Sequence, residues 1–352
     1  MDYKEKALAL HKTWAGKLEI TSRAPLRTPE DLALAYTPGV AEPCKEIAQN
    51  AELSYTYTRR GNMVAVISDG SAVLGLGNIG ALAAMPVMEG KCALFKRFGG
   101  VDAFPIVLDT QKEDEVIAAV KAIAPSFGGI NLEDIASPRC FTIEKALKEA
   151  LDIPVFHDDQ HGTAVVVLAA FINALRLTGK KAENCTVVIS GPGAAGNAIC
   201  KLLHKAGLGN VIMCDRKGTL YKGREGMDFA KTELCEFTNK ENLKGSLSDA
   251  MRGADFFVGV SAPNIVSGDM VRSMAKQPVV FGLANPVPEI MPAEALAAGA
   301  YIAGSGRSDF PNQVNNVLAF PGIFRGALDC RATAITESMK IAAAWALADS
   351  VK

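Results

Sequence analysis

The segment from residue 185 to residue 215 constrains the fold of this chain more than any other. A short apolar run, CTVVIS, leads directly into Gly-Pro-Gly-Ala-Ala-Gly at residues 191–196, and an amphipathic helical pattern follows at once. The next apolar run, NVIMC, ends at Asp215, 19 residues after the last glycine. Strand, tight glycine turn, helix and acidic residue in this spacing are the arrangement that binds dinucleotides. The alternative is a glycine-rich turn in an α/β protein that binds nothing.

The residue types in this segment suit a dinucleotide cofactor. Glycines let the backbone approach the pyrophosphate, whose charge lies at the N-terminus of the helix. We expect the cofactor to contact Gly191, Pro192, Gly193, Ala194, Ala195, Gly196 and Asp215. A carboxylate at the end of the second strand accepts hydrogen bonds from the ribose of NAD and repels the additional phosphate of NADP. Arg216 and Lys217 follow and could offset that repulsion, so the sequence favours NAD and leaves NADP open.

A second glycine motif, Gly-Leu-Gly-Asn-Ile-Gly at residues 75–80, lies in a different context. Six residues separate it from the preceding apolar run, VAVIS, and the segment that follows contains Pro86. Proline disfavours the interior of a helix. We therefore interpret this motif as a tight structural loop and not as a second cofactor site.

Apolar, β-rich runs alternate with helical patterns along the chain, which predicts an α/β fold. We expect two units, an N-terminal α/β domain over residues 1–161 and a doubly wound, Rossmann-type NAD(P)-binding domain over residues 162–318. A C-terminal helical segment, residues 319–352, is expected to pack back on the first domain. The expected strands are 63–68, 104–108, 153–156, 186–190, 210–214, 255–259, 279–283 and 300–303. The expected helices include 113–123, 142–151, 196–206 and 335–351.

Composition excludes several classes of protein. The 352 residues carry a formal net charge of −1, which gives no electrostatic reason to bind nucleic acid or an anionic membrane. The N-terminus lacks the continuous apolar core of a secretory signal, and the most apolar stretch, residues 164–172, is too short to cross a bilayer. The eight cysteines form no CxxC pair. These features favour a cytoplasmic enzyme.

Two acidic pairs stand where apolar runs end. They are Glu133–Asp134 in GGINLEDIAS and Asp158–Asp159 in IPVFHDDQHGTA. Ligand sites of α/β proteins lie at the ends of strands, and oxygen-rich sites suit hard cations such as Mg²⁺ and Mn²⁺. A solvated surface is the alternative for either pair alone, but two pairs in comparable positions favour a shared ion.

The spacing of His157 and His161 superficially resembles the HExxH motif of zinc hydrolases. That motif needs both histidines on one helix and a glutamate between them as the base. Here β-branched residues precede the pair, Gly162 follows it, and the glutamate is missing. Zinc hydrolase chemistry is therefore disfavoured.

Eight blocks, in the same order along the chain, resemble signatures of the malic enzyme family. They are YTPGVA from residue 36, SDGSAVLGLGNIG from residue 68, MEGK ending at residue 91, NLEDI from residue 131, HDDQHGTA from residue 157, GPGAAG from residue 191, LANP from residue 283 and NNVLAFPG from residue 315. They span nearly the whole chain, and the length is similar to that of the compact bacterial type. Eight ordered blocks are far more specific than any one motif.

The resemblance implies a role for individual residues. Tyr36 matches the family's tyrosine acid and Lys91 its lysine base. Glu133, Asp134 and Asp159 match three ligands of a Mg²⁺ or Mn²⁺ ion, and Asp158 matches a neighbour that is not counted as a ligand. Asn285 and Asn316 match asparagines that line the substrate and nicotinamide site.

The resemblance also implies the reaction and the assembly. We expect a homodimer that oxidises malate with NAD(P) and removes carbon dioxide to leave pyruvate. A lysine amine can accept the hydroxyl proton of malate only if burial or an adjacent cation pulls its pKa towards neutral. A divalent ion would stabilise the charge that develops on the substrate oxygen as carbon dioxide leaves.

The chain departs from the family pattern at two places. In larger eukaryotic-type members a substrate-binding arginine lies in the block that reads SDGSAV here, so Ala72 cannot serve, and another group, such as one from a partner subunit, must meet a malate carboxylate. The chain also ends at Lys352, sooner than we expect even for compact members, so that a final helical segment could be missing.

Two other functions stay open. A malolactic enzyme of the same family would convert malate to lactate without net reduction of the cofactor, but such members resemble the longer branch. A catalytically silent dinucleotide-binding sensor would not need the three carboxylates together with Tyr36 and Lys91.

Overall fold

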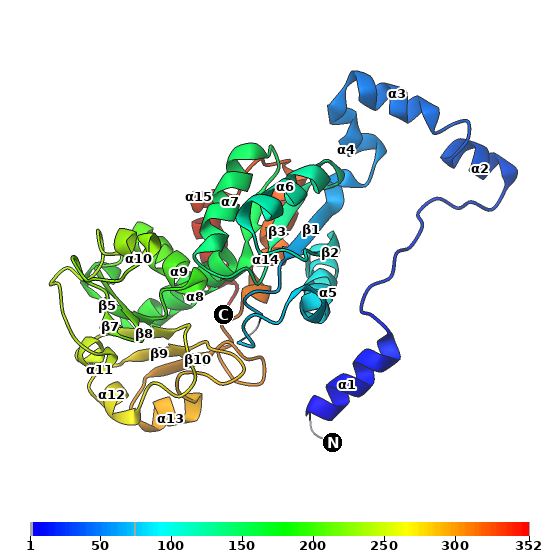
Figure 1. The fold of residues 1–352 in the computed structure, drawn as a ribbon. Coiled ribbons are helices and arrows are strands. Elements are labelled where there is room, and N and C mark those ends of the chain that lie inside the picture. Colours follow the sequence, from blue (N-terminus) through cyan, green and yellow to red (C-terminus); the bar gives the residue numbers. More distant parts are fainter. Residues whose placement is uncertain (1–2, 74, 352) are drawn as a thin grey trace.

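Two β-sheets, each covered by helices on both faces, form the body of the molecule (Figure 1). The structure is a computed structural model that describes residues 3–73 and 75–351. The α/β class predicted from the sequence is confirmed, since the first sheet is wholly parallel and the second is doubly wound.

The first sheet has the strand order β2-β1-β3-β4. Its strands are β1 (Met63–Ser68), β2 (Asp102–Val107), β3 (Gly129–Leu132) and β4 (Val155–His157). Helices α6 (Glu113–Ile123) and α7 (Arg139–Ala150) pack on the face that carries Ala65 and Ile67. Helix α5 (Ala81–Gly99) packs on the other face, against Val64 and Val66. Side chains alternate between the two faces of a strand, which explains this division.

The second sheet has the order β10-β9-β8-β5-β6-β7. Its strands are β5 (Thr186–Ser190), β6 (Asn210–Asp215), β7 (Gly218–Thr219), β8 (Phe256–Gly259), β9 (Val279–Gly282) and β10 (Ile302–Ser305), and only β7 is antiparallel to its neighbour. The order reverses between β5 and β8, and this switch point is where doubly wound folds bind their ligands. The covering helices are α9 (Ala194–Lys205), α10 (Phe229–Leu234), α11 (Leu247–Met251), α12 (Gly268–Arg272) and α13 (Pro292–Ala297).

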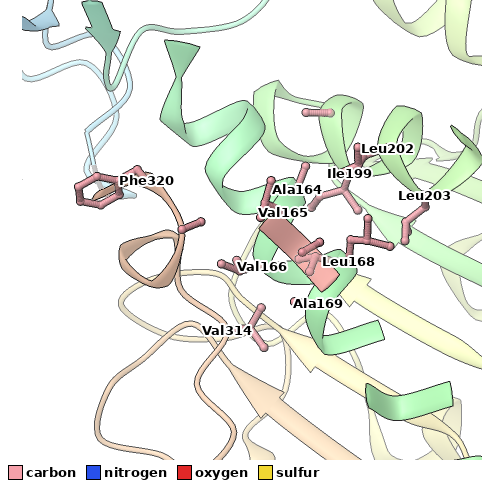
Figure 2. Close-up of a cluster of buried hydrophobic side chains, with 14 of the residues drawn as sticks. Ala164, Val165, Val166, Leu168, Ala169, Ile199, Leu202, Leu203, Val314 and Phe320 are labelled. Atoms are coloured by element: carbon pink, nitrogen blue, oxygen red, sulfur yellow. The ribbon is translucent and has the colours of Figure 1, made fainter. Parts of the chain in front are cut away.

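Helix α8 (Asp158–Thr178) connects the two sheets, because it begins directly after β4 and packs along α9. The sequence predicts a buried helix at residues 164–172, which is confirmed, although the helix begins six residues earlier. By length and composition α8 could span a membrane. In this fold it is a core helix, since Val165 and Leu168 are buried in a cluster that includes Ile199 and Leu202 of α9 (Figure 2).

The C-terminal helices contact both halves of the body. Helix α14 (Phe320–Asp329) packs on α5, and the ring centroids of Phe320 and Phe324 lie 4.7 and 5.2 Å from that of Phe95. Helix α15 (Glu337–Ser350) packs along α8. The domain boundaries at residues 161 and 318 remain predictions.

Residues 3–57 form an arm in which no described residue is buried. It contains α1 (Tyr3–Trp14), α2 (Pro29–Ala35), α3 (Ala41–Gln49) and α4 (Ser54–Tyr57). Figure 1 shows the arm extending away from both sheets, with α2 and α3 far outside the body. Large apolar side chains on the arm are exposed, among them Leu8, Ile20 and Leu34. Short helices without a core depend on contacts with another surface.

The sequence missed two strands and misjudged one helix. The expected strands agree with the structure to within two residues at each end, but β3, with four residues, and β7, with two, were not predicted. We took Pro86 as unfavourable to a helix, yet α5 runs through it for 19 residues. Pro86 lies on the exposed side of α5, where water can satisfy the carbonyl group that the missing N–H leaves unpaired.

Candidate active site

A cleft between the two sheets gathers most of the residues that the sequence singles out. The cavity has a volume of about 720 Å³ and lies at the carboxyl ends of the strands, as expected for this fold class. Its lining includes Asp134, Asp159, Ala194, Ala195, Asn285 and Asn316. Six of the residues predicted from separate parts of the sequence therefore share one cavity.

Three carboxylates meet at one end of this cleft. Glu133, Asp134 and Asp159 each offer an oxygen, and these atoms all lie within 4.8 Å of one another. Adjacent strands place them: Glu133 and Asp134 follow β3, and Asp159 opens α8 after β4. The backbone N–H of Asp134 also donates to Asp159 Oδ2 over 2.7 Å, which fixes the two loops together. The predicted metal ligands are therefore close in space.

Burial makes this group of carboxylates electrostatically unfavourable without a cation. Burial raises the pKa of Glu133 to about 7, and the negative charge of Asp159 acts in the same direction against the attraction of Lys91. Burial likewise raises the pKa of Asp159 to about 6. Carboxylate oxygens are acceptors only, and a hard divalent cation is their natural counter-charge.

Lys91 lies beside these carboxylates and not on the surface. Its Nζ is 2.9 Å from Glu133 Oε1 and 2.6 Å from Asp158 Oδ2, and 4.3 Å from the ring centroid of Phe320. The role expected of Lys91 requires that burial or an adjacent cation lower the pKa of this amine. Burial does act in that direction, but the charges of Asp158 and Glu133 outweigh it and hold the pKa above its ordinary value. In the metal-free chain Lys91 is therefore protonated.

Asp158, which the sequence names in an acidic pair without a role of its own, contacts Lys91. Its side chain is completely buried, and burial raises its pKa to about 7 despite the attraction of Lys91. Oδ2 accepts from Lys91, and Oδ1 has no hydrogen-bond partner. Gly162, one turn further along α8, leaves room for this carboxylate, because a Cβ atom there would overlap Oδ1. Adjacent aspartates in HDDQHG were the available signal, and only the structure separates their environments.

The glycine turn lies at the switch point of the second sheet, between β5 and α9. Gly191 has φ +105°, and a Cβ atom there would lie 2.6 Å from Val260 O. A Cβ atom at Gly196 would overlap the carbonyl oxygen of Gly191. Both positions therefore require glycine, and a glycine turn before a helix is the arrangement that lets the backbone approach a pyrophosphate.

The earlier glycine motif is a loop that touches the second sheet. Gly75, Gly77 and Gly80 all have φ between +73° and +79°, and a Cβ atom at Gly75 would overlap the carbonyl oxygen of Asn285. Asn285 itself lines the cleft beside Asn316. The loop thus closes one side of the cleft.

Asp215 lies at the end of β6, but its carboxylate is already engaged. Arg224 Nη2 donates to Oδ1 and Oδ2 over 2.7 and 2.8 Å, and the N–H of Lys217 donates to Oδ1 over 2.8 Å. From the sequence we named Arg216 and Lys217 as counter-charges to Asp215. Arg224 was not named, because it lies nine residues after Asp215 along the chain.

Tyr36, the predicted acid, does not line the cleft. It caps the end of α2 on the arm, and the residue is 67% exposed. Figure 1 places α2 far from the first sheet. Within a single chain Tyr36 is thus separated from Lys91 and the carboxylates.

His157 and His161 do not form a metal site together. His157 ends β4 and is fully buried, whereas His161 Nε2 lies 2.9 Å from Glu144 Oε1 and its Nδ1 lies 2.9 Å from Lys340 Nζ. His161 faces a second hollow of about 1120 Å³ between α7, α9 and α15. This hollow contains none of the carboxylates of the cleft among its lining residues.

Comparison with known proteins identifies the family. Residues 15–148 match the family model "Malic enzyme, N-terminal domain", and residues 160–352 match "Malic enzyme, NAD binding domain". The chain belongs to the malic enzyme family. Within this family it is 58% identical over 352 residues to a bifunctional malic/malolactic enzyme of Bacillus subtilis, covering 100% of this chain and 86% of that protein.

Two further members of the family extend this finding. An NADP-dependent malic enzyme of Rhizobium meliloti is 53% identical over 353 residues, which cover 99% of this chain and 46% of that protein. The crystal structure of an NAD-dependent malic enzyme from Thermotoga maritima superposes with a TM-score of 0.95 at 52% identity, over 98% of this chain and 92% of that one. The similarity to the compact bacterial type, expected from the signature blocks, is confirmed.

Proposed function

We propose that the chain catalyses the oxidative decarboxylation of (S)-malate to pyruvate and carbon dioxide, with reduction of NAD(P) and a requirement for Mg²⁺ or Mn²⁺. One observation carries this proposal. A buried lysine contacts a cluster of three carboxylates, and two of these carboxylates, Asp134 and Asp159, line the same cleft as Ala194 and Ala195 of a glycine turn of the dinucleotide-binding type. A silent dinucleotide-binding sensor would need the glycine turn but neither the buried lysine nor the cluster of carboxylates.

The residues present fit both groups. The three oxygens of Glu133, Asp134 and Asp159 are suitable ligands for a hard cation, and the glycine turn at residues 191–196, which opens α9, suits a pyrophosphate. When bound, the dinucleotide accepts a hydride from malate C2, and the cation acts as a Lewis acid on the substrate oxygens.

Lys91 is proposed to accept the proton of the C2 hydroxyl group. The amine must be neutral to do so, whereas Asp158 and Glu133 favour its charged form. A divalent cation at the carboxylates would withdraw this attraction and lower the pKa of Lys91. Asp158 positions the amine by its 2.6 Å hydrogen bond.

Asn285 and Asn316, which both line the cleft, are proposed to bind substrate and nicotinamide. Their amide groups can donate to a carboxylate and accept from a carboxamide. Ala72 cannot bind a malate carboxylate through its side chain, and its N–H donates to Asp134 O over 3.0 Å. The nearby Arg139 is 3.0 Å from Asp69 and so has a structural partner.

We further propose that the active unit is a homodimer in which Tyr36 of a second copy completes the site. Tyr36, which matches the general acid of the family, is on an arm that has no core of its own. The arm exposes its apolar side chains. Packing this arm on a second copy would bury those side chains and bring Tyr36 towards another cleft. Tyr36 would then protonate C3 after carbon dioxide has left.

A cytoplasmic location is proposed because the cysteines are unpaired. All eight are free, and six of them are buried. Free thiols are typical of reducing compartments.

A malolactic activity is the second candidate. We argued from chain length against it, but the Bacillus subtilis relative carries both activities in its name and this chain covers 86% of it. Length therefore does not separate the two activities.

The test is absorbance at the reduced-nicotinamide band with L-malate, NAD or NADP, and Mn²⁺, followed by assay of pyruvate and lactate. Reduced cofactor in equal amount to pyruvate, abolished by a chelator, supports the proposal. Lactate without net reduced cofactor would replace it with malolactic chemistry. Neither product, with intact dinucleotide binding, would support a silent sensor.

A further inference from the structure

The loop that follows β6 carries an unusual concentration of positive charge. Residues 215–225 contain four basic and two acidic residues. The basic ones are Arg216, Lys217, Lys222 and Arg224. In doubly wound folds the end of the second strand is where the adenosine ribose binds. The charge of this loop therefore acts on the ribose and on any phosphate that it carries.

We infer that Arg224 decides the dinucleotide selectivity of this chain, because it neutralises Asp215 and so allows a 2′-phosphorylated ribose to bind. The inference rests on the proposed function for the identity of the site, and it adds a specificity-determining residue. It predicts that the chain accepts both NAD and NADP, although an acidic residue at this position by itself indicates NAD.

The geometry of the pair supports a permanent neutralisation. One guanidinium nitrogen of Arg224 donates to both oxygens of Asp215, over 2.7 and 2.8 Å. The other terminal nitrogen donates to Thr219 O over 2.8 Å and to Gly218 O over 3.3 Å. The side chain of Arg224 is only 9% exposed and that of Asp215 17%. Arg224 is thus fixed by the backbone of β7 as well as by its charge partner.

The pair leaves Asp215 able to serve NAD. A carboxylate has about four acceptor sites, and Asp215 uses three, two on Oδ1 and one on Oδ2. The remaining site on Oδ2 can accept one ribose hydroxyl group. Asp215 therefore retains a role in binding NAD while it no longer presents an unbalanced charge to NADP.

The other basic residues of the loop differ in their availability. Arg216 and Lys217 are exposed, and among the described residues neither forms an ion pair. They can contact a phosphate at the ribose. Lys222 instead lies 2.9 Å from Glu236 Oε2. It has the same charge on the same loop but another partner, which makes it a matched control.

The experiment is a calorimetric titration of the full chain, without malate, using NAD, NADP, 5′-AMP and 2′,5′-ADP as probes. The last two differ only in the ribose phosphate and do not depend on nicotinamide or on turnover. The wild type is compared with three single variants, Arg224→Ala, Arg224→Lys and Lys222→Ala. The single variant Asp215→Ser is compared with the double variant Asp215→Ser/Arg224→Ala. Circular dichroism confirms that each is folded.

We expect wild type to bind both members of each probe pair. Arg224→Ala should weaken NADP and 2′,5′-ADP by about tenfold or more relative to NAD and 5′-AMP, since it exposes the phosphate to an unpaired carboxylate. Arg224→Lys should lose less of the affinity for NADP and 2′,5′-ADP. Lys222→Ala should leave the ratio of NADP affinity to NAD affinity unchanged. In the Asp215→Ser background, removal of Arg224 should have a smaller effect, because the carboxylate that it neutralises is gone.

An unchanged NADP-to-NAD ratio in Arg224→Ala overturns the inference, as does equal loss of all four probes, which would mean that Arg224 only supports the loop. A wild type that binds NAD alone overturns it too. Failure of the proposed function has a different signature: both probe pairs behave as expected, but malate is not converted.

Discussion

Lys91 Nζ lies 2.6 Å from Asp158 Oδ2, and neither side chain is more than 8% exposed. The two residues come from different halves of the site, since Lys91 is on α5 beneath the first sheet and Asp158 begins α8 after β4. The pair therefore fixes the proposed base relative to Asp159, the next residue along α8. An acidic residue that binds no metal in our assignment still determines where the amine points.

Replacing Lys91 by Ala should lower kcat by a factor of about 10²–10⁴, the usual contribution of one acid–base group. The dissociation constant for NAD should not change, because Lys91 is not among the residues expected to contact the dinucleotide. Steady-state kinetics and calorimetry measure the two quantities. Lys96→Ala is the matched control, since Lys96 lies on the same helix and is paired with Asp102 at 2.6 Å. Normal turnover in Lys91→Ala would remove its assigned role.

Tyr36 offers a test of the proposed dimer. Lys91→Ala and Tyr36→Phe chains carry two different tags and are co-expressed, so that mixed dimers can be purified. If Tyr36 acts on the other copy, one of the two sites in a mixed dimer is intact, and its activity should be about half that of wild type by symmetry. If Tyr36 acts within its own chain, both sites are defective and the mixed dimer should be as inactive as each parent. Full activity of Tyr36→Phe alone would exclude any role for this residue.

Sequence patterns predicted the fold well where elements are long and regular. The strand over residues 186–190, the glycine turn and the apolar part of α8 follow from local periodicity, and each was predicted. Strands β3 and β7 escaped because pairing with neighbours, not local preference, forms them. Pro86 misled for a related reason, since its effect on α5 depends on which face of the helix meets water.

The sequence predicted six residues that share the cleft, but it did not predict the electrostatics around them. Acidic pairs at strand ends pointed to Asp134 and Asp159, which line the cleft. No local pattern could indicate that Asp158 would face Lys91, 67 residues earlier, or that Arg224 would neutralise Asp215. Such pairs depend on how separate elements pack. The arm shows this most clearly. Tyr36 was expected beside Lys91, but within one chain the arm holds it away from the first sheet.

The affinity for Mn²⁺ should fall as the pH is lowered through the neutral range. In the metal-free fold the pKa of Glu133 is raised to about 7 and that of Asp159 to about 6, and the cation binds only their ionised forms. Above both values no proton competes with the ion. Below them each displaced proton weakens apparent binding by up to about tenfold per pH unit. Titration of free Mn²⁺ by electron paramagnetic resonance, from about pH 8 to about pH 5.5, measures this dependence.

The same shifts predict the sign of a stability effect. A carboxyl group whose pKa is raised in the fold above its unfolded value disfavours folding at high pH, and this penalty is lost progressively as the pH falls from the folded pKa towards the unfolded pKa. Mn²⁺ removes this penalty, so the increase in Tm on adding Mn²⁺ should be larger at about pH 8 than at about pH 5.5. Measuring Tm with and without Mn²⁺ at each pH cancels the contributions of titratable groups far from the ion. A Tm increase that is independent of pH would contradict the assignment of Glu133 and Asp159 as ligands.

Gly162→Ala tests the space around Asp158. Alanine normally stabilises a helix interior by about 0.5–1 kcal/mol relative to glycine. At residue 162, however, the new Cβ atom would overlap Asp158 Oδ1, and it would lie 3.2 Å from Asn316 Cβ. The carboxylate must then move from Lys91, at a cost of about 1–3 kcal/mol for overpacking. Both Tm and kcat should therefore fall, as measured by thermal unfolding and malate turnover.

Gly326→Ala provides the matched control for this last substitution. Gly326 is an exposed residue in the interior of α14, and a Cβ atom there meets nothing within 4 Å. The same chemical change should raise Tm slightly and leave kcat unaltered, because only helix preference acts there. Opposite signs at the two glycines would assign the effect at residue 162 to Asp158. If instead both variants gain stability and turn over malate normally, the Asp158–Lys91 geometry tolerates displacement, and its role in positioning the base is wrong.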